Sequence, residues 1–220
     1  MLQVYGRKNS NQVIQLMWTV GELDLEYVRH NVGGSFGGLN SDEYGNLNPN
    51  RLVPTIVDDG FVLWESYAII RYLCRRYGFG SLWPEDPCQS GLADQWMEWT
   101  SSRFMGTFFP AFWNLIRTPK DKQDLEKVST AAKDTGALLQ IIESQLEGNE
   151  FLIGDALTMG DIPLGSMMFK YFNLPIERPS LPNIERWYAR LSERTAYCEH
   201  AMNPFGTSPE EWLAIEKGGA

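Results

Sequence analysis

Residues 48–66 read NPNRLVPTIVDDGFVLWES, and this stretch decides the fold of the first third of the chain. The segments PTIV (54–57) and FVLW (61–64) have the apolar, β-branched and aromatic composition of strands, and a tight DDG turn separates them. Because Asp-Gly is a strong signal for a two-residue hairpin turn, we expect these two strands to pair antiparallel. Glu65 and Ser66 then open the apolar-periodic run SYAIIRYLCRRY, which predicts a helix that ends at Gly78.

The segments before this hairpin alternate between strand and helix patterns. LQVY (2–5) predicts a strand, and a polar loop at residues 6–11, called the first loop below, leads into the helical run QVIQLMWTVGEL. LEYVRHNV predicts a second strand, and SDEYGNL predicts a short helix after a Gly-rich loop. The first 80 residues therefore predict the order βαβαββα.

The rest of the chain has helical patterns only. Pro84 and Pro87 interrupt helical order in FGSLWPEDP, which predicts a linker. Helices are expected near 90–116, 122–147, 158–172, 182–195 and 209–217. The predicted architecture is an α/β domain at residues 1–80, a linker at 81–88 and an all-α domain at 89–220.

Composition excludes several classes of function. With 28 Asp and Glu against 19 Lys and Arg, the formal charge is -9, which argues against a nucleic-acid partner. No apolar stretch approaches the roughly 20 residues that cross a bilayer, and MLQVYGRKNS lacks a secretory signal, so we expect a cytoplasmic protein without a membrane partner.

The cysteines and histidines indicate neither a disulfide framework nor a metal site. Cys74, Cys88 and Cys198 form no CxxC pair, and His30 and His200 are the only histidines. We therefore predict no metal. Cys74 lies in the apolar run AIIRYLCRRY and is expected to be a buried small hydrophobe rather than a nucleophile.

The order of elements and several motifs together resemble the cytosolic glutathione transferase family over nearly the whole length. In that family an NP-x-x-x-VP loop precedes the hairpin and a Glu-Ser or Asp-Ser pair follows it, as Pro54 and Glu65 do here at a separation of eleven residues. The first loop, GRKNSNQV, resembles a bacterial subgroup in which Ser or Asn replaces a tyrosine. LTMGDIPLG resembles the family's N-capping motif, with Thr158 as N-cap and Asp161 at N3. The resemblance implies a thioredoxin-like domain followed by a helical domain.

Glutathione carries a carboxylate at each end and a thiol between them. Ser66 at a helix N-terminus suits a carboxylate, and the resemblance implies that it holds the γ-glutamyl carboxylate while Glu65 accepts a bond from the γ-glutamyl amino group. Helix capping alone is the competing interpretation of this pair. The resemblance also implies a cis Val53–Pro54 bond, with the Val53 backbone pairing with the cysteinyl backbone of glutathione. Arg51 is a candidate partner of the glycine carboxylate, with an ordinary surface arginine as the alternative.

A thiol with a pKa near 8.5 is mostly protonated at neutral pH, so the enzyme must favour the thiolate. The resemblance aligns Ser10 with the family's serine, whose hydroxyl would donate to the sulfur with help from the helix dipole. Asn9 and Asn11 remain competitors because the alignment can shift by one or two residues. A plain N-cap role for Ser10 is the alternative.

An aromatic-rich segment, WMEWTSSRFMGTFFPAFWNLI, follows the linker. In the family the acceptor pocket lies between the first loop and this helix, which implies that some of Phe104, Phe108, Phe112 and Trp113 line it; helix-packing core is the competing interpretation of each. Arg7 lies near the expected mouth and would favour an anionic acceptor, although a solvated loop charge is the simpler interpretation.

The resemblance predicts a glutathione transferase with glutathione as co-substrate. It would add the thiolate to a small apolar or aromatic electrophile, serve detoxification, and form a homodimer. Two alternatives stay open: a glutathione-dependent peroxidase or disulfide reductase on the same fold, and a non-catalytic glutathione-binding or scaffold protein. A cysteine-based reductase is disfavoured because the first loop contains no Cys.

Overall fold

A mixed four-stranded sheet forms the N-terminal part of the computed structural model, which describes residues 1–218. The strands are β1 (Leu2–Tyr5), β2 (Tyr27–His30), β3 (Thr55–Asp58) and β4 (Phe61–Trp64), in the spatial order β2-β1-β3-β4. β1 is parallel to β2 and antiparallel to β3. The predicted antiparallel pairing of β3 with β4 is confirmed. Asp59 (φ 49°) and Gly60 (φ 87°) both adopt positive φ, the conformation of the tight turn that an Asp-Gly pair favours.

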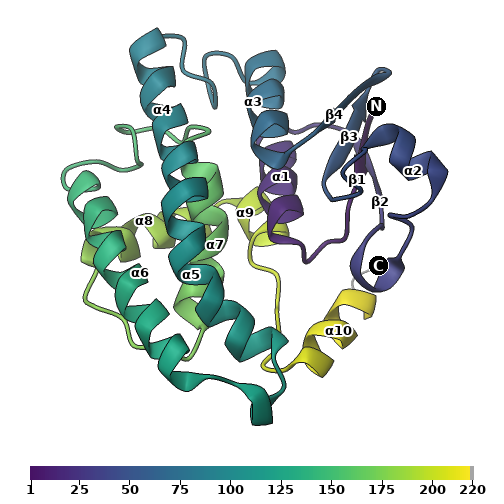
Figure 1. Ribbon diagram of the computed structural model, residues 1–220. Coiled ribbons are helices and arrows are strands. Elements are labelled where there is room, and N and C mark those ends of the chain that lie inside the picture. Colours follow the sequence, from purple (N-terminus) through teal and green to yellow (C-terminus); the bar gives the residue numbers. More distant parts are fainter. Residues whose placement is uncertain (219–220) are drawn as a thin grey trace.

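Helices cover both faces of this sheet. α1 (Asn11–Glu22) and α3 (Ser66–Tyr77) pack on the face toward the helical part, and α2 (Asp42–Leu47) lies on the other side, preceded by the short 3₁₀ turn η1 (Gly34–Phe36) (Figure 1). Val4, Ile56 and Ile69 are completely buried where the sheet meets α1 and α3. The predicted order βαβαββα is confirmed.

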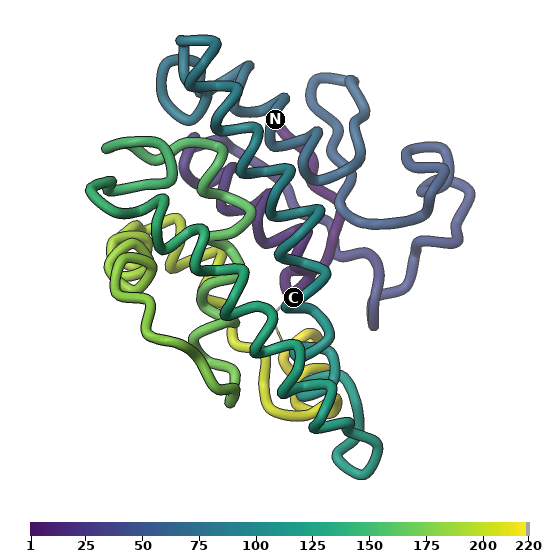
Figure 2. The backbone as a smooth tube through the Cα atoms, turned by 60° about the vertical axis from the view of Figure 1, so that its left-hand side comes forward, coloured from purple at the N-terminus to yellow at the C-terminus, as the bar shows by residue number. Residues whose placement is uncertain are grey.

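The helical part begins with a nearly continuous run. It comprises α4 (Pro87–Trp99), a π-helical turn η2 (Thr100–Phe104), α5 (Met105–Phe112) and a second π-helical turn η3 (Trp113–Arg117). α6 (Leu125–Gln145) follows the 3₁₀ turn η4 (Lys120–Lys122) and lies beside α5 in both views (Figures 1 and 2). The remaining helices are α7 (Asp161–Asn173), α8 (Pro182–Ser192), α9 (Thr195–His200) and α10 (Pro209–Gly218).

Several element boundaries differ from the predicted ones. α4 begins at Pro87 rather than near residue 90, because the Asp86 side chain accepts the Gln89 N–H (2.9 Å) and caps the helix. The helix predicted at 182–195 is divided, since α8 ends at Ser192 and α9 begins at Thr195. The predicted helical domain extends to residue 220, and its last two residues lie outside the described part. None of the helices within residues 1–218 combines the length and apolarity needed to cross a membrane.

The sheet and helical parts share one apolar core. Ile14 and Trp18 of α1 and Ile70 and Cys74 of α3 belong to the same buried cluster as side chains of the helical part. Cys74 is completely buried, as expected, and burial raises the pKa of its thiol to about 12. This common core fixes the first loop relative to the helices that face it.

The start of α7 is held by a buried carboxylate. Asp161 accepts hydrogen bonds from the Leu152 N–H (2.9 Å), the Thr158 N–H (3.0 Å) and the Trp187 indole N–H (3.1 Å). Burial nevertheless raises the pKa of Asp161 to about 6. The bond from Asp161 back to Thr158 is the one that the capping motif predicts. The helix itself starts later than predicted, at Asp161, and the Thr158 hydroxyl accepts the Gly160 N–H (3.3 Å).

Lys170 of α7 is a buried amine without a hydrogen-bond partner in residues 1–218. Its Nζ lies 5.9 Å from the ring centroid of Phe112, and burial lowers the pKa of the amine to about 7. The unfolded chain therefore binds more protons than the folded chain between pH 7 and the ordinary value of 10.5, so this group makes the protein more stable as pH rises through that range.

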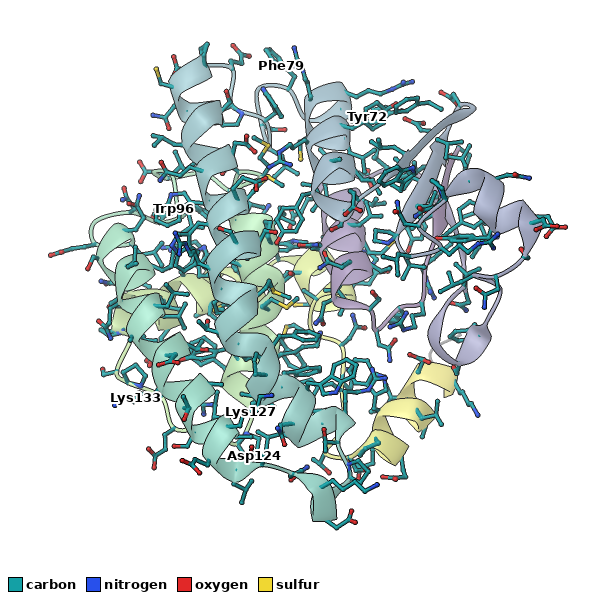
Figure 3. All side chains as sticks on the ribbon, in the orientation of Figure 1. Tyr72, Phe79, Trp96, Asp124, Lys127 and Lys133 are labelled. Atoms are coloured by element: carbon teal, nitrogen blue, oxygen red, sulfur yellow. The ribbon has the colours of Figure 1, made fainter. Side chains whose placement is uncertain are left out.

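Replacing Lys170 with Met is expected to raise the free energy of unfolding at pH 7 by about 2 to 4 kcal/mol, because an apolar side chain of similar length needs no desolvation of charge. The gain should shrink as pH rises toward 10. Urea unfolding at several pH values measures both effects. The matched control is Lys133→Met, since Lys133 is exposed on α6 (Figure 3). Equal or lower stability of Lys170→Met at pH 7 would contradict the prediction.

Candidate active site

A cavity of about 450 Å³ lies where the first loop faces the helical part. One wall consists of the first loop and the start of α1, and the other comes from α5, η3 and α10. α10 packs against η3 of its own wall and also contacts η1, near the sheet part (Figure 1). The lining residues are Arg7, Asn9, Ser10, Asn11, Gln12, Met105, Gly106, Phe109, Phe112, Trp113, Arg117 and Trp212.

Ser10 is the N-cap residue of α1, but its side chain makes no capping hydrogen bond. Its carbonyl accepts the N–H groups of Val13 (2.9 Å) and Ile14 (2.8 Å), which begins the helix. Ser10 lines the cavity at the start of the helix, where the first N–H groups have no helical partner. A hydroxyl and a helix N-terminus that both lack a local acceptor can stabilise an anion in the cavity.

Asn9 and Asn11 also line the cavity. Asn9 is buried and lies beside the Glu216 carboxylate, yet neither its amide nitrogen nor its amide oxygen forms a well-aligned hydrogen bond within residues 1–218. The buried Oδ1 of Asn11 likewise has no partner there. Buried amides normally have a partner, so these polar atoms are available to hydrogen-bond a ligand in the cavity. Both residues remain competitors of Ser10.

Ser66, at the start of α3, is tied to α1 by two side-chain hydrogen bonds. Its hydroxyl donates to Gln12 Oε1 (2.6 Å) and accepts from Gln15 Nε2 (2.8 Å). Gln12 also lines the cavity next to Ser10, so one side chain connects the region of the first loop with the start of α3. The sequence motifs single out neither glutamine, because their partner lies more than 50 residues away.

Glu65 has a positive φ of 71° and an exposed side chain that does not cap α3. Its carbonyl accepts the Ile69 N–H (2.9 Å) and begins the helix. The N–H groups of the first helical turn, starting with Ser66, therefore have no helical partner. The carboxylate of Glu65 and these N–H groups provide an acceptor and donors side by side, which suits an amino acid group carrying both charges.

The Val53–Pro54 peptide bond is cis, as the resemblance implied. The carbonyl of the preceding Leu52 accepts hydrogen bonds from the Tyr44 hydroxyl (2.6 Å) and from the Asn48 side-chain amide (2.9 Å). This explains the Asn of the NP motif, whose buried side chain anchors the loop. No backbone hydrogen bond within residues 1–218 involves the N–H or C=O of Val53, so both are open to a partner.

Arg51 already has a structural role. Its Nη1 donates to the carbonyls of Leu39 (3.0 Å) and Ser41 (2.8 Å), and thereby holds the loop before α2. Binding of a glycine carboxylate by Arg51 would have to use the other N–H groups of its guanidinium, and stays a prediction.

The structure separates the four predicted aromatic residues. Phe112 and Trp113 line the cavity. Phe104 and Phe108 do not, which corrects their assignment to the pocket: both are completely buried and stack on each other with ring centroids 5.2 Å apart. They belong to the helix-packing core, the competing interpretation of each.

Six of the lining residues were not predicted: Gln12, Met105, Gly106, Phe109, Arg117 and Trp212. Met105, Phe109 and Phe112 recur at helical spacing, but so do Phe104, Phe108 and Phe112, so spacing alone did not show which face lines the pocket. No local signal identifies Trp212, because α10 reaches the cavity through tertiary packing.

α10 is attached to the first loop and to η1 by a buried carboxylate. Glu216 forms an ion pair with Arg7 (Nε to Oε2, 3.0 Å) and accepts the Ser35 N–H (2.7 Å). Burial favours a higher pKa for Glu216, but the bonds from Ser35 and the Arg7 charge outweigh it and hold the pKa below the usual 4.5. The carboxylate therefore stabilises the fold above pH 4.5, and this contribution is lost as pH falls through the lowered pKa.

Replacing Glu216 with Gln should loosen α10, because the ion pair with Arg7 is lost while the size of the side chain is kept. We expect amide exchange in residues 209–218 to accelerate about tenfold, which corresponds to about 1.4 kcal/mol for the loss of this ion pair. Hydrogen–deuterium exchange measures this, with Glu210→Gln on the exposed face of α10 as the control. Equal exchange in the two variants would show that Glu216 does not hold the helix.

Two family models match this chain. The model described as "Glutathione S-transferase, N-terminal domain" matches residues 10–76, and the model described as "Glutathione S-transferase, C-terminal domain" matches residues 92–195.

Relatives and solved structures span almost the same length. Glutathione S-transferase GstB of Escherichia coli K12 is 32% identical over 206 residues, which cover 93% of this chain and 99% of GstB. Glutathione S-transferase D6 of Drosophila melanogaster is 26% identical over 88% of both chains. The theta class glutathione S-transferase of the citrus canker pathogen Xanthomonas axonopodis pv. citri, solved with glutathione bound, is 41% identical with a TM-score of 0.88 and covers 93% of this chain and 99% of that one.

Proposed function

The chain belongs to the glutathione S-transferase family, and we propose on that premise that its glutathione lies between the first loop and the start of α3, with the sulfur at the N-terminus of α1. The protein is a glutathione transferase with glutathione as co-substrate. The individual roles of its residues in that reaction are our proposals.

The position of Gln12 carries this proposal. Gln12 lines the cavity beside Ser10 and is hydrogen-bonded to Ser66 (2.6 Å). In the proposed pose the γ-glutamyl group occupies the start of α3, with its carboxylate on the N–H groups near Ser66 and its amino group on Glu65. The cysteinyl backbone pairs with the open N–H and C=O of Val53. These contacts direct the thiol into the cavity.

Ser10 is the proposed activator of the thiol. Its hydroxyl and the N-terminus of α1 favour the thiolate by donating hydrogen bonds to the sulfur, which lowers the thiol pKa. The thiol proton passes to solvent, and no base on the protein is needed. The thiolate then attacks the electrophilic carbon; the carbon–sulfur bond forms, and the leaving group departs with its electron pair.

Ser10→Ala is expected to raise the pKa of the bound thiol by about 1 unit, since each unit corresponds to about 1.4 kcal/mol, the size of one hydrogen bond to an anion. The rate should fall about tenfold at neutral pH and recover above the pKa of the free thiol. Ultraviolet titration of the bound thiolate tests this against Asn9→Ala and Asn11→Ala. If one of those variants shifts the thiol pKa and Ser10→Ala does not, the role belongs to that asparagine.

Glu65→Gln tests the γ-glutamyl position. Glu65 is exposed and makes no capping bond, so the substitution should leave the fold intact. We expect calorimetry to show a roughly 2- to 5-fold weaker affinity for glutathione, the range of one exposed ion pair. Affinity for glutaryl-cysteinyl-glycine, which lacks the amino group, should not change. Equal weakening for the two ligands would place the amino group elsewhere.

A small apolar or aromatic electrophile is the proposed acceptor. Phe109, Phe112 and Trp113 offer it a largely aromatic wall, a better match for an aryl or alkyl group than for a small peroxide. Detoxification is the physiological role that this acceptor class suggests.

We also propose a cytoplasmic homodimer with domains at residues 1–80 and 89–220 joined at 81–88. Cys74, Cys88 and Cys198 are free thiols, which fits a reducing compartment. Exposed apolar side chains such as Leu52 in the sheet part and Leu92 in the helical part are compatible with a partner subunit.

A further inference from the structure

The charges around the cavity differ from those of the whole chain. The protein has 28 acidic residues and a formal charge of -9. The cavity lining nevertheless contains Arg7 and Arg117 and no Asp or Glu. In the described part of this acidic protein, the charged side chains that line the cavity are thus all positive, which favours an anionic ligand there.

The two arginines are not equivalent. Arg7 is neutralised by Glu216 at 3.0 Å. Arg117 of η3 has no carboxylate within salt-bridge distance in the described residues, and instead its guanidinium lies over the rings of Trp113 (5.1 Å to the centroid) and Trp212 (4.7 Å). The net charge of Arg7, Glu216 and Arg117 together is +1. Because Arg7 and Glu216 cancel each other, this charge belongs to Arg117.

Contact with two indole rings pre-organises the guanidinium of Arg117 to bind an anion. A guanidinium is weakly hydrated, stays charged at neutral pH, and keeps its N–H edges free when its face rests on an aromatic ring. The indole N–H of Trp212, another lining residue, is buried and has no acceptor within residues 1–218. A carboxylate can therefore find an unpaired cation here, and an aromatic body can pack on the same indoles.

We propose that the acceptor substrate is an aromatic electrophile with a negatively charged substituent, such as a carboxylate, that binds Arg117 while its ring packs against Phe109 and Trp113. This inference rests on the proposed function, because it concerns the acceptor side of the same site. Arg117 belongs to the wall opposite the first loop, so its proposed role is to select the electrophile. Activation of the sulfur is the separate role proposed for Ser10.

Two probes separate charge from reactivity: para-fluoro-meta-nitrobenzoate and its methyl ester. In both, the thiolate attacks the ring carbon that carries fluorine, a carbon–sulfur bond forms, the carbon–fluorine bond breaks, and fluoride leaves with its electron pair. The reaction needs no oxidant or reductant. Each kcat/KM is divided by the uncatalysed rate constant of the same probe with glutathione, which removes the intrinsic difference in reactivity.

We expect the normalised kcat/KM of the wild-type enzyme to be at least about tenfold higher for the benzoate than for the ester, the size of one charge-assisted hydrogen bond. Arg117→Gln should remove most of this preference, and Arg117→Lys should keep part of it because it retains the charge. The matched control is Lys120→Gln, an exposed cation three residues further along that does not line the cavity. It should retain the full preference.

Three results would overturn the inference. One is a wild-type enzyme that turns over both probes with a normalised kcat/KM for the ester equal to or higher than that for the benzoate. Another is an equal loss for both probes in Arg117→Gln, which would assign Arg117 to the thiolate or to the fold. The third is failure to turn over either probe or chloro-dinitrobenzene, together with no calorimetric binding of glutathione. That last result contradicts the proposed function itself, and the inference falls with it.

Discussion

The burial of α1 on two sides is the constraint on which the rest of the structure depends. Val13 and Leu16 pack into the core beneath the sheet, whereas Ile14 and Trp18 pack into the core of the helical part. Every residue from 13 to 20 is buried, so the helix can neither rotate nor slide without exposing apolar surface. Its N-terminus, with Ser10 as the N-cap, is thereby held at one end of the cavity, and the glutamine–serine bonds connect it to the start of α3.

The sequence predicted the parts of the fold and the site that are encoded locally. The Asp-Gly turn and its flanking strands lie in one stretch of 19 residues, where turn residues and strand-like composition identify them without tertiary information. The cis Val53–Pro54 bond was instead expected from the resemblance of the VP pair in that stretch to the family. Gln12 was missed because its role depends on Ser66. Trp212 and Glu216 were missed because α10 meets the first loop some 200 residues after it in the chain. Phe108 was placed in the pocket because a helix that is apolar on most sides does not show which face is buried.

The acceptor side of the cavity depends on contacts between distant segments. α5 and η3 provide the aromatic wall, and α10 closes it with Trp212, while the ion pair between Arg7 and Glu216 attaches that helix to the first loop. This ion pair also cancels one of the two positive charges in the lining. The single charge that remains, on Arg117, rests against indole rings, where it is less hydrated than on the open surface. Closure of the cavity and selection of its ligand are therefore linked through the same few side chains.

The central claim is that the N-terminus of α1 holds the sulfur of glutathione. A crystal structure of the protein with glutathione tests it most directly. The account predicts the sulfur within about 3.5 Å of Ser10 Oγ, on the cavity side of α1, with the γ-glutamyl carboxylate on the first N–H groups of α3. A sulfur bound to Asn9 or Asn11 instead, or a glutathione whose γ-glutamyl group lies away from Glu65 and Ser66, would contradict it.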